Sequence, residues 1–384
     1  MTTVTASRGF SIGLAGGLFV ITVAAFSRIP VVAQIGRDLS LSSVGVGALA
    51  SMFAVGRVVT DIPAGRLSDR VKPGLMMAIA GSLVMVGSAL LAIAHRPLVA
   101  FVGVFVAGAG SAWTLTTSMA YFARAPKARR GKSLSYMAAA LLTGQAVGPA
   151  VGGVLAGIFD WRWSLVLASV LAGMTAIPFL RWRGPAREAV DGDEELGDDR
   201  ATPLVLAVLY LLPAVQFSIG AAIIQTLIPL LADGPLGIPV GIVGIALGLG
   251  AVGRFAGAML AGQVSDRFGR RPALLPGLAV QIVGLSMLMV SESTWAWWAT
   301  ILLVSLGSVT VNVGTTILAD LSGGSLGHRL GVFRLTGDSA FVVAPLLAGW
   351  LYARSGQAIA TIPSVALTGF VLVAAFLWLP ETHR

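Results

Sequence analysis

The sequence predicts an all-α integral membrane protein with twelve transmembrane helices, arranged as two six-helix parallel repeats. Composition is the first of three observations behind this prediction: 56% of the 384 residues are hydrophobic and 11% are charged, whereas a soluble domain carries about a quarter charged residues. The second is the length of the apolar blocks. Residues 10–27 and 204–231 contain no charge, and a helix of about 20 residues crosses roughly 30 Å of hydrocarbon. The third is an internal repeat that relates the two halves of the chain.

Charged or turn-rich breaks divide the chain into twelve predicted spans, at 10–32, 42–62, 74–93, 98–122, 133–158, 162–180, 204–229, 238–261, 273–290, 295–319, 330–352 and 359–379. With the N-terminus inside, the cytoplasmic segments hold 18 of the 26 Lys and Arg residues and the outer loops hold four. Because basic residues collect in cytoplasmic loops, we expect a multi-pass protein of the cell membrane with both termini cytoplasmic. The same bias explains the net charge of +9 without a nucleic-acid partner.

The repeat relates "AVGRVVTDIPAGRLSDR" at 54–70 to "AVGRFAGAMLAGQVSDR" at 251–267, with nine of 17 positions identical at an offset of 197. Both copies close a predicted span. Seven acidic residues cluster in 188–199, a composition typical of a solvated linker. We therefore predict an N-terminal six-helix bundle at 1–183, a cytoplasmic acidic linker at 184–203 and a C-terminal six-helix bundle at 204–384.

The loops that end the two copies carry a charged motif. They read "GRLSDRVKP" and "GQVSDRFGRR", and the matching residues are Gly65, Asp69, Arg70, Gly262, Asp266, Arg267, Gly269 and Arg270. With these paired loops, the sequence resembles the major facilitator superfamily over essentially its whole length. The resemblance implies a transporter that works by alternating access, with these loops as cytoplasmic gates. We expect Gly65 to permit the tight turn between spans and, by resemblance, Asp69 to meet the N-terminal end of span eleven.

A second motif, "GQAVGPAVGG", lies in predicted span five and contains Gly144, Gly148, Pro149, Gly152 and Gly153. It resembles the signature of the proton-coupled antiporter branches. Glycines four apart clear one helix face for a second helix, and proline bends a helix. An ordinary small-residue helix contact is the alternative reading.

The resemblance implies proton-coupled efflux of small amphipathic organic compounds. The sequence departs from the drug-antiporter pattern at Val104, where those relatives carry arginine. The alternative is therefore an uptake carrier or uniporter for an organic anion, with Arg28 or Arg334 as its anchor.

Ionisable residues inside spans usually face the protein interior and pair. Arg57 with Asp61, and Arg334 with Asp338, stand at i and i+4, so each pair shares a helix face. Asp338 is the deepest acid, and either a coupling role or a static ion pair is open to it. Arg28 has two alternatives, snorkelling to the outer surface or binding an anionic substrate.

In the family that the sequence resembles, spans one, four, seven and ten line the substrate cavity. The candidates for this cavity, with one addition from span five, are Arg28, Trp113, Thr117, Tyr121, Gln145, Gln216, Gln225 and Asn312. With three histidines and no cysteine, the chain offers no His/Cys metal cluster. We expect no enzymatic activity, no metal and no cofactor. The expected partners are the lipid bilayer, a small-molecule substrate and protons, and the protein is expected to be a monomer.

Overall fold

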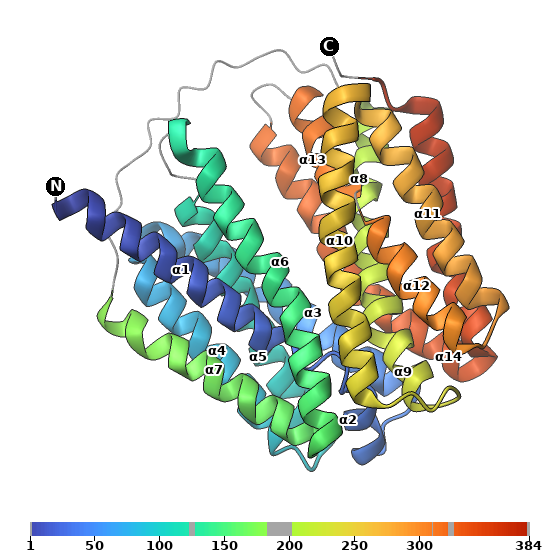
Figure 1. Ribbon diagram of the computed structural model, residues 1–384, viewed down its shortest axis with the longest axis horizontal. Coiled ribbons are helices and arrows are strands. Elements are labelled where there is room, and N and C mark those ends of the chain that lie inside the picture. The colour runs from blue at the N-terminus through green and yellow to red at the C-terminus, as the bar shows by residue number, and fades with distance from the viewer. Residues whose placement is uncertain (1, 123–126, 183–201, 309, 322–325, 382–384) are drawn as a thin grey trace. The chain divides into compact units, whose positions relative to one another are not determined.

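The computed structural model describes residues 2–122, 127–182, 202–308, 310–321 and 326–381 (Figure 1). Every regular element in these ranges is helical, which confirms the all-α prediction. Contacts divide the chain into two compact units. The first comprises Met1–Leu41, Met52–Asp191 and Ile238–Gly248, and the second comprises Ser42–Ser51, Gly192–Gly237 and Leu249–Arg384. The predicted linker at 184–203 falls almost wholly outside the described residues, so the domain boundary stays a prediction.

The described residues of the first half of the chain form seven helices: α1 (Thr2–Phe26), α2 (Val32–Asp38), α3 (Ser43–Arg70), α4 (Pro73–Ala92), α5 (Pro97–Phe122), α6 (Lys127–Ile158) and α7 (Trp161–Arg181). In the first unit, α4 packs on α5 and α7, and α1 packs on α6 and α7. The local sequence determines where several of these helices begin. Pro73 occupies the first turn of α4, where a missing N–H costs nothing, and Asp160 caps α7 by accepting a hydrogen bond from the Arg162 backbone N–H at 2.9 Å.

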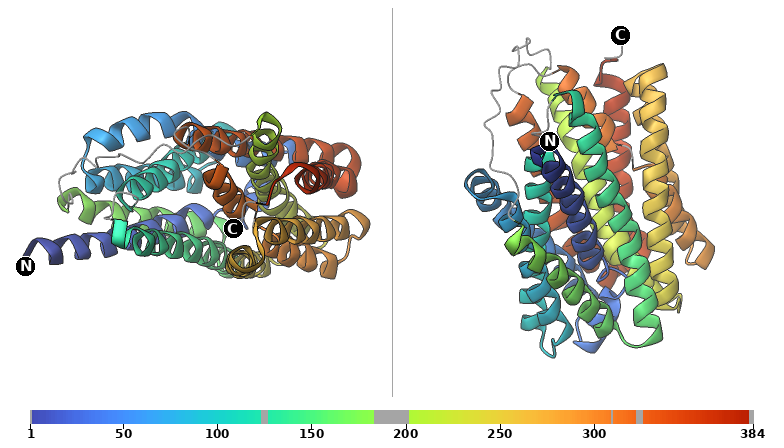
Figure 2. Two further views of the ribbon diagram at one scale, coloured as in Figure 1. Left: turned by 90° about the horizontal axis from the view of Figure 1, so that it is seen from above. Right: turned by 60° about the vertical axis from the view of Figure 1, so that its left-hand side comes forward.

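The second half of the chain forms α8 (Pro203–Ser218), the π-helix η1 (Ile219–Leu227), α9 (Ile228–Asp233), α10 (Val240–Phe268), α11 (Arg270–Val290), α12 (Thr294–Leu306), α13 (Thr310–Leu321) and α14 (Leu326–Trp378). In the second unit, α14 packs on α8, η1 and α11, and α11 packs on α12. Figure 2 shows the helices of each unit from two further sides.

The helices account for the twelve predicted spans. Eleven helical stretches of the described residues are long and apolar enough to cross a membrane. The last of them, Arg329–Trp378, contains two spans, because Gly356 interrupts α14 with a φ of 78° that only glycine adopts readily. Predicted spans seven and ten are each built from more than one element: α8, η1 and α9 in the first case, α12 and α13 in the second.

The outer surfaces are apolar, as a lipid environment requires. On α7, Val170, Met174 and Ile177 are more than half exposed, while Ala168 and Ala172 on the opposite face are fully buried. A helix that is apolar all round belongs in a protein core or in a membrane. This pattern agrees with a multi-pass membrane protein.

The structure corrects one expectation about the gating loops. Gly65 does not make a turn, because α3 continues as a helix to Arg70, eight residues beyond the predicted end of span two. Gly262 likewise lies inside α10, which ends at Phe268. A drop in hydropathy marks the membrane surface, whereas backbone hydrogen bonding continues into the charged residues. The second loop turns at Gly269, where φ is 106°.

Candidate functional site

A chain of hydrogen-bonded amides and hydroxyls crosses the second unit. Gln281 Nε2 of α11 donates to Gln216 Oε1 of α8 at 3.1 Å, and Gln216 Nε2 donates to Ser308 Oγ at 2.9 Å. Ser308 Oγ then donates to the Val304 carbonyl at 2.9 Å. The chain thus joins three segments that are far apart in sequence.

This polar chain adjoins irregular helix at two of its members, Gln216 and Ser308. Gln216 lies three residues before η1, in which Thr226 Oγ1 donates to the Ala221 carbonyl five residues back at 2.8 Å. Ser308 follows the end of α12, at the break before α13. Short π-helices and discontinuous membrane helices are frequent at functional sites. Gln225 lies within η1 and is half-buried.

Within this polar chain, Gln281 carries a buried polar atom that has no hydrogen-bond partner among the described residues. Its residue is fully buried, and its Oε1 has no hydrogen-bond partner in the described structure. Buried polar atoms are nearly always hydrogen-bonded, so an exception calls for an explanation. Sequence reasoning missed Gln281 and Ser308. The available signal was that Gln281 is the single amide in 273–290, where the one other polar side chain is Ser286.

Thr114, Thr117, Ser118 and Tyr121 recur three and four residues apart and form one polar stripe on α5, whose first three members are buried. Thr117 and Ser118 are at most 1% exposed, and their hydroxyl oxygens have no partner among the described residues. Trp113 Nε1 is likewise a buried atom with no hydrogen-bond partner among the described residues. Thr114 satisfies itself by donating to the Gly110 carbonyl at 2.9 Å. In this conformation the stripe is therefore enclosed, and its role in a substrate cavity stays a prediction.

Tyr121 belongs to an aromatic cluster formed by Phe10, Tyr121, Phe122, Phe179 and Trp182. Its ring meets Phe10 edge to face with centroids 5.2 Å apart, and its hydroxyl lies 2.9 Å from Ser11 Oγ. The Trp182 ring covers Gly13, where an added Cβ would clash with it. The cluster holds the start of α1 against α5 and α7, which the sequence did not predict.

The charged residues inside the first unit have specific neighbours. Arg28 is 6% exposed and its guanidinium lies 3.8 Å from the Phe53 ring centroid. The snorkelling alternative for Arg28 is therefore wrong, because the side chain is enclosed by protein. Asp61 Oδ1 accepts a hydrogen bond from Thr116 Oγ1 of α5 at 3.3 Å, and Arg57 lies one turn earlier on α3.

Asp338 and Arg334 lie together on α14. The Arg334 Nε to Asp338 Oδ2 distance is 3.5 Å, and Asp338 is 6% exposed. Thr336 fixes this part of α14 to α8 by donating to the Tyr210 carbonyl at 2.7 Å. A buried carboxylate beside an arginine can change its charge when that pairing changes.

The loop after α10 is held by a charged network. Glu381 receives the backbone N–H groups of Arg270 at 2.8 Å and Arg271 at 3.1 Å, so it caps α11. The Arg270 side chain reaches Asp266 at 3.3 Å and Asp320 at 3.2 Å. Arg270, at the start of α11, therefore forms ion pairs near the ends of both α10 and α13.

The remaining loop and cavity candidates are placed as follows. Arg267 is exposed, and so are Gly262, Arg70 and Asn312. Gln145 is half-buried on α6. The Asp69 side chain lies outside the described residues, so its predicted contact stays a prediction.

The glycines of span five lie where α6 approaches other backbones. A Cβ added at Gly144 would meet Thr22 Cβ at 2.7 Å, and one at Gly148 would meet the Val23 carbonyl at 2.8 Å. At Gly152 the clash is with Ser27. Gly153 faces away from α1, toward Gly244 Cα at 2.6 Å. One glycine row therefore packs on α1, and the Pro149 carbonyl and Gly153 pack on α10.

Two apolar helical units, with discontinuous spans in the second and a buried carboxylate beside an arginine, are typical of a polytopic transporter. The model of the Major Facilitator Superfamily matches residues 14–234 and 212–384, so the chain belongs to that superfamily of secondary transporters and not to an enzyme family.

Similar proteins include Multidrug resistance protein 1 of Bacillus subtilis, which is 27% identical over 84% of this chain and 85% of its own length. The Gentisate transporter of Corynebacterium glutamicum is 26% identical over 83% of this chain and 75% of its own. The Quinolone resistance protein NorA of Staphylococcus aureus is 22% identical over 90% of both.

The fold matches a solved bacterial homologue of the human lysosomal transporter Spinster, in an inward-facing and occupied conformation. The TM-score is 0.81, with 16% identity over 97% of this chain and 96% of that one. This likeness concerns the fold alone.

Proposed function

We propose that the chain exports small amphipathic organic compounds in exchange for protons, by alternating access, with both termini in the cytoplasm. The observation that carries this proposal is the span-five motif, whose glycines lie within 3 Å of neighbouring backbone or side-chain atoms once a Cβ is added. Helix faces that lack side chains can slide or rock against each other without repacking bulky groups. The names of two relatives, a multidrug resistance protein and a quinolone resistance protein, support the efflux direction.

The polar groups of the second unit suit an uncharged or weakly charged compound. Gln216, Gln281 and Ser308 offer amide and hydroxyl groups, which orient a substrate by hydrogen bonds without fixing its charge. These groups adjoin η1 and the α12–α13 break. A bound compound would therefore contact segments whose helical hydrogen bonding is already irregular.

The direct test is transport by the purified protein in proteoliposomes with and without an imposed pH gradient. Tetracycline, a quinolone and gentisate serve as probe compounds. We expect export of tetracycline or of the quinolone when the compartment that receives the compound is the more acidic one, because protons then move in the opposite direction. Movement that ignores the gradient would overturn proton coupling while leaving transport itself in place.

Asp338→Asn tests the coupling residue. The variant keeps side-chain size but cannot ionise, so we expect normal folding and membrane level, retained counterflow, and loss of gradient-driven accumulation. Glu292→Gln, at an exposed carboxylate between α11 and α12, is the matched control and should keep gradient-driven transport. Unchanged accumulation by Asp338→Asn would remove this carboxyl group from the coupling step.

The alternative function is uptake or facilitated movement of an organic anion. It is favoured by one relative, a gentisate transporter, whose named substrate is an anion, and by the enclosed Arg28 beside Phe53. Counterflow of labelled gentisate, lost in Arg28→Gln and retained in Arg354→Gln, would support this alternative over efflux.

A further inference from the structure

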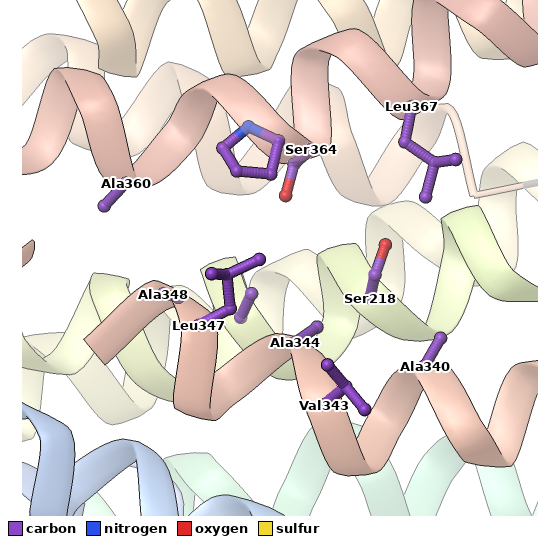
Figure 3. A pocket seen from close by; sticks show the side chains of 11 residues that line it. Ser218, Ala340, Val343, Ala344, Leu347, Ala348, Ala360, Ser364 and Leu367 are labelled. Carbon is purple, nitrogen blue, oxygen red and sulfur yellow. The ribbon is translucent and has the colours of Figure 1, made fainter. Parts of the chain in front are cut away.

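An elongated groove lies in the second unit between the α8–η1 junction and the two halves of α14 (Figure 3). Its volume is about 190 Å³, which exceeds the 150 Å³ of an engineered apolar cavity that binds benzene. Ser218, Ala344 and Leu367 each contribute one wall. The hydroxyls of Ser218 and Ser364 point into this space from opposite sides (Figure 3).

The groove runs along the helices and not across them. On one wall it extends from Ala340 to Ala348, eight residues or about 12 Å of helix. On the opposite wall it extends from Leu367 back to Ala360. Ala348 and Ala360 flank Gly356, where α14 reverses, so one end of the groove lies toward that turn. Its length is comparable to half of the roughly 30 Å hydrocarbon layer.

The groove is open to hydrocarbon. Val343 and Leu347 at its rim are 60% and 40% exposed, whereas Ala348 and Ala360 on its floor are 2% exposed. No charged residue occurs between 339 and 353, so this part of α14 lies within the apolar layer. Ser218 Oγ already donates to the Val215 carbonyl at 2.9 Å. A long, thin, apolar occupant therefore matches the walls.

An arginine, Arg354, lies beyond the Leu347 end of the groove. Arg354 is seven residues after Leu347, which places both on the same face of α14, about 10.5 Å apart along the axis. Arg354 is exposed, and its guanidinium lies 4.6 Å from the centroid of the Trp350 ring. Tryptophan is enriched at the membrane–water interface, and arginine binds phosphate through a planar fork of donors.

We propose that this groove is a binding site for a phospholipid of the leaflet on the Gly356 side. One acyl chain lies along Ala340–Ala348, and the lipid phosphate contacts Arg354. The site is separate from the proposed transport function and does not depend on it.

The test uses the full-length protein in phosphatidylcholine nanodiscs that contain a small share of phosphatidylglycerol with a diazirine on one acyl chain. After illumination, mass spectrometry maps the labelled residues. We expect label concentrated in 340–348 and 360–367. If the parent protein is labelled evenly over exposed apolar residues, such as Val170 and Met174 of α7, the proposal is wrong.

Three variants sharpen the test. Ala344→Phe fills the groove and should reduce labelling there at least tenfold, whereas Ala366→Phe, at an exposed position outside the groove, should not. Arg354→Gln should reduce labelling by the anionic probe about fivefold, the effect of one basic residue on an anionic lipid. Labelling by the phospholipid probe that is equal in the parent and in Arg354→Gln would show a chain site without a phosphate contact, and so contradict the proposal.

Discussion

Replacing Gly152 with alanine would place a methyl group against the backbone of Ser27. The added Cβ would clash with the Ser27 carbonyl oxygen and would lie 2.7 Å from its Cα and 2.8 Å from its carbonyl carbon. All three are backbone atoms, so no side-chain rotation relieves the contact. Moving the Ser27 Cα alone from 2.7 Å to the 3.4 Å of ordinary contact separates α6 from Ser27 by at least 0.7 Å, and the nearer carbonyl oxygen demands more.

The expected cost combines two opposing effects. Overpacking a well-packed site costs about 1–3 kcal/mol, while alanine in place of glycine gains roughly 1 kcal/mol of helix propensity. Gly157→Ala on the same helix is the matched control, because its nearest contact would be an ordinary 3.5 Å to Gly241 N. The difference in stability between the two variants isolates the packing cost of about 1–3 kcal/mol.

The assay is thermal unfolding of both variants and the parent in one detergent, followed by intrinsic fluorescence and by retention of the monodisperse peak. We expect Gly152→Ala to unfold at a lower temperature than Gly157→Ala. Equal stability of the two variants would refute the close approach at Gly152, and with it the packing reason for a glycine there.

Three further variants test other contacts. Glu381→Ala removes the carboxylate that caps α11 and should cost about 1 kcal/mol; an unchanged melting temperature would contradict the capping role. Gln281→Leu leaves Gln216 without its donor and should cost about 1–3 kcal/mol, and the double variant Gln281→Leu/Gln216→Leu should recover part of that loss; additive losses would argue against the amide contact. Tyr121→Phe keeps the ring packing but loses the contact with Ser11, so a small loss of about 0.5–1.5 kcal/mol is expected, and a loss as large as that of Tyr121→Ala would contradict it.

Several features of the site could be anticipated and others could not. Gln216 was predicted because the family resemblance assigns span seven to the cavity. Its partners Gln281 and Ser308 were not, because a hydrogen bond between α8 and α11 depends on how those helices pack. For the same reason the sequence did not predict that Tyr121 packs on Phe10.

The end of α3 shows a second kind of limit. Hydropathy predicted that span two ends at residue 62, and the helix continues to Arg70. Hydropathy reports where the chain leaves hydrocarbon, whereas a helix ends where its backbone hydrogen bonds end. Lys72 and Pro73 provide that stop, since proline suits the first turn of the next helix.

The sequence by itself determined the membrane class, the number of spans, the repeat and the superfamily. These follow from runs of apolar residues and from local motifs, and both can be found without knowing which helices touch. Only the tertiary structure decided that Gly152 faces Ser27, that Glu381 caps α11, and that η1 and the α12–α13 break adjoin one polar chain. The physical reason is that each of these contacts joins segments distant in sequence, and their packing selects one partner from many that local chemistry allows.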